Sequence, residues 1–95
     1  MAIKIKIFGL LRLNSGLKEL ELEAGKGTRR LGDILYELGS YKGLEPLKEL
    51  ASSNMKNGSP FIIMVDGTNW MQLKGLDSVV KDGQVVSIFP PSAGG

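Results

Sequence analysis

The stretch KDGQVVSIFPPSAGG, residues 81–95, decides the fold that we expect for this chain. Lys81-Asp82-Gly83 indicates a turn, and residues 84–89 form a run rich in β-branched and aromatic residues, which predicts a strand. Pro90 and Pro91 each hold φ at about −65° and lack an N–H, so neither can continue a sheet ladder. The strand is therefore expected to stop at Phe89 and to lead into an extended segment.

That segment is a tail of prolines and small residues: Pro90, Pro91, Ser92, Ala93, Gly94 and Gly95. At roughly 3.3 Å per residue it would reach about 20 Å beyond the domain. Glycine lacks a Cβ, so a final Gly-Gly fits a narrow channel and presents its carboxylate to another protein's catalytic centre. The alternative is an ordinary frayed terminus. We divide the chain into a domain at 1–89 and a flexible, insertable tail at 90–95.

The composition excludes many kinds of catalysis. The sequence has 95 residues, enough for one small domain, and contains no cysteine and no histidine. Thiolate nucleophiles, imidazole bases, Cys/His zinc sites and disulfides are therefore ruled out. The remaining acidic candidates show no pairing pattern beyond caps, turns and solvated faces: Asp33, Glu37, Asp77 and Asp82. We expect a protein that is not an enzyme and that binds no metal or cofactor itself.

Charge and hydropathy predict where the protein works. The net charge of +2 is too mild to indicate nucleic-acid binding. No apolar stretch approaches the roughly 20 residues of a membrane span, and the N-terminal residues alternate Lys with Ile instead of forming the apolar core of a signal. The absence of cysteine agrees with a reducing compartment. These features predict a cytoplasmic protein that contacts neither nucleic acid nor membrane directly.

Strict alternation of apolar and charged residues predicts two strands near the start. Residues 3–8 place isoleucines on one face and lysines on the other, and residues 18–23 repeat the pattern with glutamates outside. If the two pair through a loop at 14–16, Lys4 and Lys6 lie across from Glu19, Glu21 or Glu23. A first hairpin is expected.

Two helices are expected in the middle. Thr28 is a candidate N-cap for a helix that runs to about Leu38 and stops at Gly39. Its apolar stripe consists of Leu31, Ile34, Leu35 and Leu38, which we assign to the core. A shorter helix is predicted over residues 44–53, with Pro46 in its first turn and an apolar side of Leu47, Leu50 and Ala51. The polar stretch at 52–60 is expected to be a loop.

The last third of the chain completes the predicted sheet. Residues 61–65 are continuously apolar and end at Asp66-Gly67, which is typical of a buried central strand entering a turn. Residues 69–73 are expected to form a short strand or an irregular edge. The resulting order of elements predicts an α+β protein of the β-grasp (ubiquitin-like) type. It would have a mixed four- to five-stranded sheet, one main helix across one face and a short second helix.

Several motifs resemble those of the MoaD/ThiS ubiquitin-like sulfur carriers. Phe8-Gly9-Leu10-Leu11-Arg12 followed by Gly16 is similar to that family's Phe-Ala-x-Leu-Arg-x-x-x-Gly signature. Towards the end the similarity lies in Val65-Asp66-Gly67, Leu76, residues 81–91 and Gly94-Gly95. The long middle, residues 41–60, resembles archaeal-type MoaD-like proteins, some of which act as protein modifiers.

This resemblance implies a carrier whose chemistry takes place at Gly95. A ubiquitin-activating-enzyme-like adenylyltransferase would use ATP and Mg²⁺ to convert the Gly95 carboxylate to an acyl-adenylate. A persulfide would then supply the sulfur of a Gly95 thiocarboxylate. In a molybdopterin synthase, the large subunit would be the second partner, and the sulfur would enter the molybdenum or tungsten cofactor.

Partner docking is expected on the sheet face opposite the helix, and the candidate residues are Phe8, Met64, Trp70, Phe89 and Arg12. Three of them have a simpler alternative. Phe89 would be core as an aromatic at a strand end, and Trp70 would be partly buried packing. Arg12 would be solvated or locally paired.

Four further readings of the function remain open at this stage. The same activation could end in an isopeptide bond to a target-protein lysine, or in sulfur delivery to tRNA thiolation. The domain could also be a non-catalytic β-grasp interaction module with an inert tail. A catalytic enzyme is the least favoured, for the reasons of composition given above.

Overall fold

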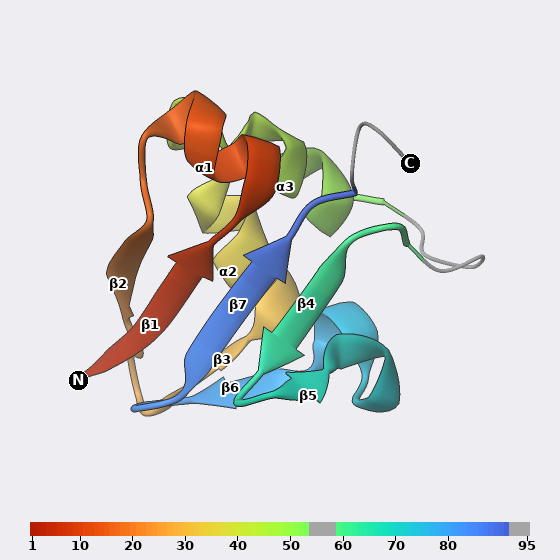
Figure 1. Cartoon of the computed structure of the whole chain (residues 1–95). Coiled ribbons are helices and arrows are strands. Elements are labelled where there is room, and N and C mark those ends of the chain that lie inside the picture. The colour runs from red at the N-terminus through yellow and green to blue at the C-terminus, as the bar shows by residue number, and fades with distance from the viewer. Residues whose placement is uncertain (54–58, 92–95) are drawn as a thin grey trace.

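The computed structural model describes residues 1–53 and 59–91, in which a five-stranded sheet carries its helices mainly on one face (Figure 1). The strand order is β2-β1-β7-β4-β5, and the central β7 runs parallel to β1 and antiparallel to β4. The strands of this sheet are β1 Ala2–Ile7, β2 Glu19–Glu23, β4 Ile62–Val65, β5 Thr68–Asn69 and β7 Val85–Phe89. The predicted mixed α+β sheet is confirmed, and β7 ends at Phe89 as Pro90 requires.

The first two strands pair as predicted, but the connection between them is not a simple loop. Lys4 lies opposite Glu21 and Lys6 opposite Glu19 in the antiparallel register. Between the strands is a helix, α1 Gly9–Ser15, so the prediction of a plain hairpin was wrong. The helix forms because Leu11 enters the core and because Gly16 adopts φ 75° and closes its C-terminus with an N–H···O bond to Arg12.

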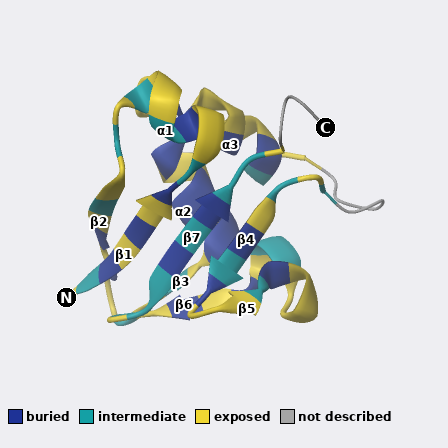
Figure 2. Cartoon of the chain, viewed as in Figure 1, coloured by how far each residue is buried: buried dark blue, intermediate teal, exposed yellow. Residues whose placement is uncertain are grey.

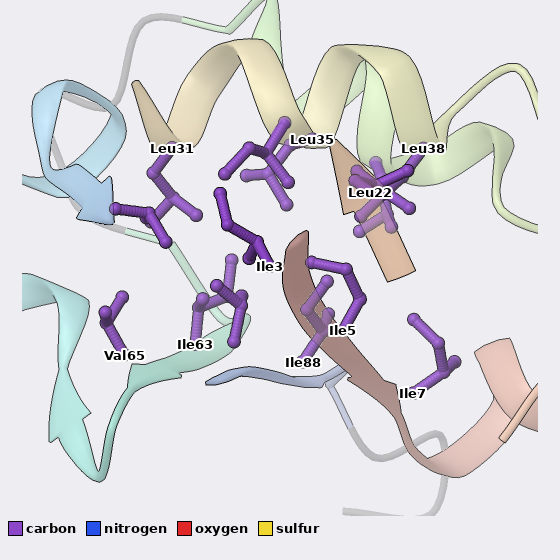
Figure 3. Close-up of a cluster of buried hydrophobic side chains, with 14 of the residues drawn as sticks. Ile3, Ile5, Ile7, Leu22, Leu31, Leu35, Leu38, Ile63, Val65 and Ile88 are labelled. Atoms are coloured by element: carbon purple, nitrogen blue, oxygen red, sulfur yellow. The ribbon is translucent and has the colours of Figure 1, made fainter. Parts of the chain in front are cut away.

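The core lies between one face of the sheet and α2 Leu31–Leu38 (Figure 3). All four residues of the predicted helical stripe are fully buried there: Leu31, Ile34, Leu35 and Leu38. Alternate strand residues form the other side of the same buried cluster, namely Ile3, Ile5, Ile7, Ile63, Val86 and Ile88. Removing this apolar surface from water, at about 25 cal/mol per Å², is the main term that holds the helix to the sheet.

The start of the main helix differs from the prediction. Thr28 is not an N-cap, because β3 Thr28–Arg30 pairs with β6 Val79–Lys81 in a separate two-stranded sheet. The helix begins only at Leu31, and Arg30 precedes it. Arg30 Nε donates to Asp77 Oδ1 at 2.7 Å, and this hydrogen bond raises the pKa of the guanidinium. Pairing with a strand 50 residues away therefore outweighs the local capping preference of threonine.

The second helix, α3 Glu45–Ala51, is confirmed, with Pro46 in its first turn and with Leu47 and Leu50 buried. Gly39 ends α2 as predicted, but its φ of −67° is right-handed, so a left-handed turn is not the reason for glycine. A Cβ there would press on the Cβ of Lys48 and lie 2.6 Å from the Lys48 backbone N. The glycine is needed because α3 crosses so close to the end of α2.

β4 is not buried on both faces as its continuous apolar sequence predicted. Ile63 and Val65 face the core, whereas Ile62 is 47% exposed. The predicted turn at Asp66-Gly67 is present, with φ of 49° and 84°, and it leads into β5. Of the short strand or irregular edge expected at 69–73, Asn69 belongs to the edge strand β5, and Trp70–Gln72 forms a 3₁₀ helix instead. A second 3₁₀ helix follows at Gly75–Asp77. The loop predicted at 52–60 lies partly outside the described residues.

Replacing Gly39 tests the close helix crossing. Replacing glycine by alanine at a helix end with a right-handed φ normally raises the free energy of unfolding by roughly 0.4–1 kcal/mol. Because the added methyl would meet the Lys48 backbone, Gly39→Ala is expected instead to lower the free energy of unfolding by about 1–3 kcal/mol. Urea denaturation measures the change. Glu49→Ala, at an exposed site on α3, is the control and should stay within about 0.5 kcal/mol of the wild type. A stabilised Gly39→Ala protein would contradict the crossing.

Candidate functional site

The tail leaves the central strand of the sheet, at the end of β7, beside the first turn of α1 (Figure 1). We call the sheet surface opposite α2 the outer face. Figure 2 shows the alternation of burial along β1, β7 and β4, which leaves every second residue on this surface. Its exposed or half-buried members are Lys4, Lys6, Ile62, Met64, Val85, Ser87 and Phe89. The outer face thus has an apolar part on β4 and β7 and a charged part on β1 and β2.

Two of the predicted docking residues meet at the base of the tail. The rings of Phe8 and Phe89 stack with their centroids 4.4 Å apart and an interplanar angle of 10°. The backbone N–H of Phe8 donates to Ile88 O at 3.1 Å, which ties the end of β1 to β7. Phe89 is half-buried and lies outside the core cluster, so the alternative that assigned it to the core is wrong.

Arg12 joins the same group from α1. Its guanidinium carbon lies 4.9 Å from the centroid of the Phe8 ring, and its Nε donates to Ile7 O at 2.8 Å. The interpretation of Arg12 as locally paired is therefore confirmed. We refer to these three side chains as the Arg12–Phe8–Phe89 stack. Sequence similarity indicated the residues individually, whereas their contact depends on β1 and β7 being neighbours.

The first tail residue packs against the start of α1. A Cβ placed on Gly9 would lie 3.0 Å from Pro90 Cγ and 3.3 Å from Cδ, and Gly9 has a left-handed φ of 61°. Pro90 is half-buried and Pro91 is exposed. The tail residues Ser92, Ala93, Gly94 and Gly95 lie outside the described residues, so their predicted insertion and the chemistry at Gly95 stay predictions.

Met64 and Trp70 separate in the structure. Met64 is half-buried on the outer face, where the register places it next to Ser87 of β7, so it stays a docking candidate. Trp70 is fully buried, so its assignment to an exposed docking patch is wrong. Ile62, which lies opposite Phe89 in the register, was not among the predicted docking residues. The period of two through Ile63 and Val65 would have placed it on the outer face.

The charged part of the outer face contains a weak ion pair. Lys4 Nζ lies 3.6 Å from a Glu19 carboxylate oxygen, and both side chains are about half exposed, so this ion pair adds little stability. Within residues 1–53 and 59–91, no three acidic side chains come together in a way that could hold a metal ion. No helix in this same part of the chain is long and apolar enough to cross a membrane.

The sheet order, the crossing helix and the exit of the tail from the central strand define a ubiquitin-like β-grasp protein. The family model for ThiS proteins matches residues 5–95. A candidate sulfur carrier protein of Archaeoglobus fulgidus is 36% identical over 98 aligned positions, which cover all of both chains. The chain therefore belongs to the ThiS family, whose relatives include sulfur carriers and ubiquitin-like small modifiers.

Solved structures with this fold include three that are informative. Small archaeal modifier protein 1 of Methanosarcina acetivorans is 28% identical, with a TM-score of 0.72, covering 99% of this chain and 96% of that one. A candidate molybdopterin converting factor subunit 1 of Pyrococcus furiosus is 26% identical, with a TM-score of 0.62 and coverage of 95% and 97%. In the BexX/CysO complex of Amycolatopsis orientalis, a chain 24% identical matches the fold with a TM-score of 0.74 and coverage of 99% and 100%.

The burial of Trp70 is testable by fluorescence. Since Trp70 is the only tryptophan and is fully buried, acrylamide should quench the native protein several-fold less than the urea-unfolded protein. If acrylamide quenched the native protein to the same extent as the unfolded chain, Trp70 would be exposed in the folded state, which would contradict its burial.

The Phe8–Phe89 contact is testable by a double-mutant cycle. Phe8→Leu, Phe89→Leu and the double variant should show a coupling free energy of about 0.5–1.5 kcal/mol in urea denaturation, because only the wild type keeps both stacked rings. The same cycle on Phe8 and Met64 serves as a control. Strictly additive effects for the two phenylalanines would contradict the stacking.

Proposed function

We propose that this protein is a sulfur carrier whose Gly95 carboxylate is activated by a partner and converted to a thiocarboxylate. The observation that carries the proposal is the match to the ThiS family, which continues through the tail to Gly95. The candidate sulfur carrier of A. fulgidus, aligned over its whole length, supports the same reading. The catalytic groups would belong to the partners, and this chain would act as their substrate and carrier.

The proposed chemistry begins with a poor electrophile. A carboxylate repels nucleophiles and has no good leaving group, so an adenylyltransferase resembling the ubiquitin-activating enzyme would attach AMP from ATP, with Mg²⁺, and release pyrophosphate. The terminal sulfur of a protein persulfide would then attack the acyl carbon and displace AMP, giving an acyl disulfide. A second thiol would cleave that S–S bond, leaving the Gly95 thiocarboxylate and a disulfide between the two thiols.

The geometry suits the carrier role because the reacting end would be separated from the docking surface. Pro90 and Pro91 lead away from the central strand, and residues 90–95 have a maximum reach of about 20 Å. The apolar part of the outer face, with Ile62, Met64 and Phe89, could stay bound to a partner while the tail enters its active site. Holding the carboxylate in a fixed position there replaces much of the entropy cost of a bimolecular reaction.

The destination that we propose for the sulfur is the pterin of the molybdenum or tungsten cofactor, with a molybdopterin synthase large subunit as the second partner. The 26% identical molybdopterin converting factor subunit of P. furiosus supports this choice. The second candidate function is conjugation of Gly95 to lysines of target proteins. It is supported by the 28% identical small archaeal modifier protein of M. acetivorans. Sulfur delivery to tRNA would use the same activation.

The mass of the protein recovered from its native host tests the proposal. Replacing one oxygen by sulfur adds about 16 Da, the same shift as oxidation of one of the four methionines. Treatment with iodoacetamide separates the two, since the chain has no cysteine and a thiocarboxylate would be its only sulfur nucleophile that is alkylated readily. Alkylation localised to Gly95 by fragmentation is the expected result.

A variant that lacks Gly94 and Gly95 is the matched control and should show neither the mass shift nor alkylation. Tryptic fragments that join Gly95 to a lysine of another protein, without any alkylated Gly95, would favour the modifier. An unreactive, unconjugated Gly95 would leave the domain as a non-catalytic interaction module.

A further inference from the structure

α1 lies beside the point where the tail leaves the sheet, and contacts at both of its ends hold it there. Leu11 anchors the helix in the core, and Gly16 closes its C-terminus. At that end α1 also packs tightly on the α2–α3 connection, because a Cβ on Gly43 would lie 2.6 Å from Ser15 N and from Asn14 O. At the other end the backbone of Gly9 lies against Pro90. A helix held at both ends can impose a direction on a chain that touches it.

Arg12 is the side chain that transmits this constraint to the last strand. Its Nε donates to the last carbonyl of β1, at Ile7, and its guanidinium lies over the Phe8 ring. The ring of Phe8 in turn stacks on Phe89, the residue directly before Pro90. The contacts therefore run from Arg12 of α1 to Phe8 at 4.9 Å and from Phe8 to Phe89, the residue before the tail, at 4.4 Å, while the 2.8 Å bond to Ile7 O holds Arg12 in place.

We propose that Arg12 is a positioning residue, which holds Phe8 against Phe89 and so sets the direction in which Pro90 leaves the sheet. The expected effect on catalysis rests on the proposed carrier function, whereas the effect on the direction of Pro90 does not. In the described part of the chain Arg12 has no carboxylate partner, so its charge is available for a second use, as a docking contact with an acidic partner. The two roles make different demands on the side chain.

The substitution Arg12→Lys distinguishes the two roles, because lysine keeps the positive charge and lacks the planar guanidinium group. Its ammonium is a point charge on a flexible stem, without the planar group that stacks on Phe8 and without the Nε that bonds Ile7 O. If Arg12 positions the tail, Arg12→Lys should be as defective as Arg12→Gln. If Arg12 acts only through its charge, Arg12→Lys should behave as the wild type and Arg12→Gln should bind the partner more weakly.

The first measurement needs no partner. One-bond Cα–Hα dipolar couplings of Pro90 and Pro91, recorded in an aligned sample of the full chain, report the direction of the tail base. They should change in both Arg12→Lys and Arg12→Gln. Arg30→Lys is the matched control, because it makes the same substitution at an arginine that lies outside this stack and is paired with Asp77 instead. Its couplings should equal those of the wild type.

The second measurement is pyrophosphate release with the adenylyltransferase of the same host, ATP and Mg²⁺. For Arg12→Lys we expect KM within about twofold of the wild type and kcat lowered about tenfold, since a misdirected tail reaches the active site in the wrong orientation. Arg30→Lys should retain both constants. An Arg12→Lys protein with unchanged couplings and unchanged kcat would overturn the inference. Absence of pyrophosphate release from the wild type would instead defeat the proposed function, and the couplings would still decide whether Arg12 directs the tail.

Discussion

The parallel pairing of β1 with β7 is the contact on which the rest of the structure depends. It joins strands about 80 residues apart in the sequence and places β7 at the centre of the sheet. Because Ile7 lies beside Ile88, the residues that follow them, Phe8 and Phe89, can stack, and α1 comes to lie beside Pro90. The hydrophobic core and the base of the tail are therefore organised by the same pairing.

Local sequence patterns predicted the elements that are stabilised by one buried face. The spacing of Leu31, Ile34, Leu35 and Leu38 and the alternation of residues 3–8 each match a single period, and the observed burial follows them. The same patterns failed where a distant strand competes with a local preference. Thr28 is a good capping residue, but its pairing with Lys81 in β6 makes it part of a strand.

The site was predictable in its residues and not in their contacts. Phe8, Arg12 and Phe89 follow from motifs, whereas their stacking requires the β1–β7 register and the helix α1. No regular spacing of apolar residues predicted that helix. Trp70 shows the opposite limit. A lone tryptophan near polar residues suits a surface or a core equally well, and only the turn at Asp66-Gly67 and the 3₁₀ helix after β5 direct it inward.

β2 has a consequence for how the protein behaves in a crowded cell. It is an edge strand, so the backbone groups along its free side are available to any strand from another molecule. Its sequence ELELE carries three exposed glutamates in five residues. Edge-to-edge growth between two copies would bring these like charges together. Strand β5, at the opposite edge, has only two residues. Both edges of the five-stranded sheet therefore resist amyloid-like addition of a strand from another copy.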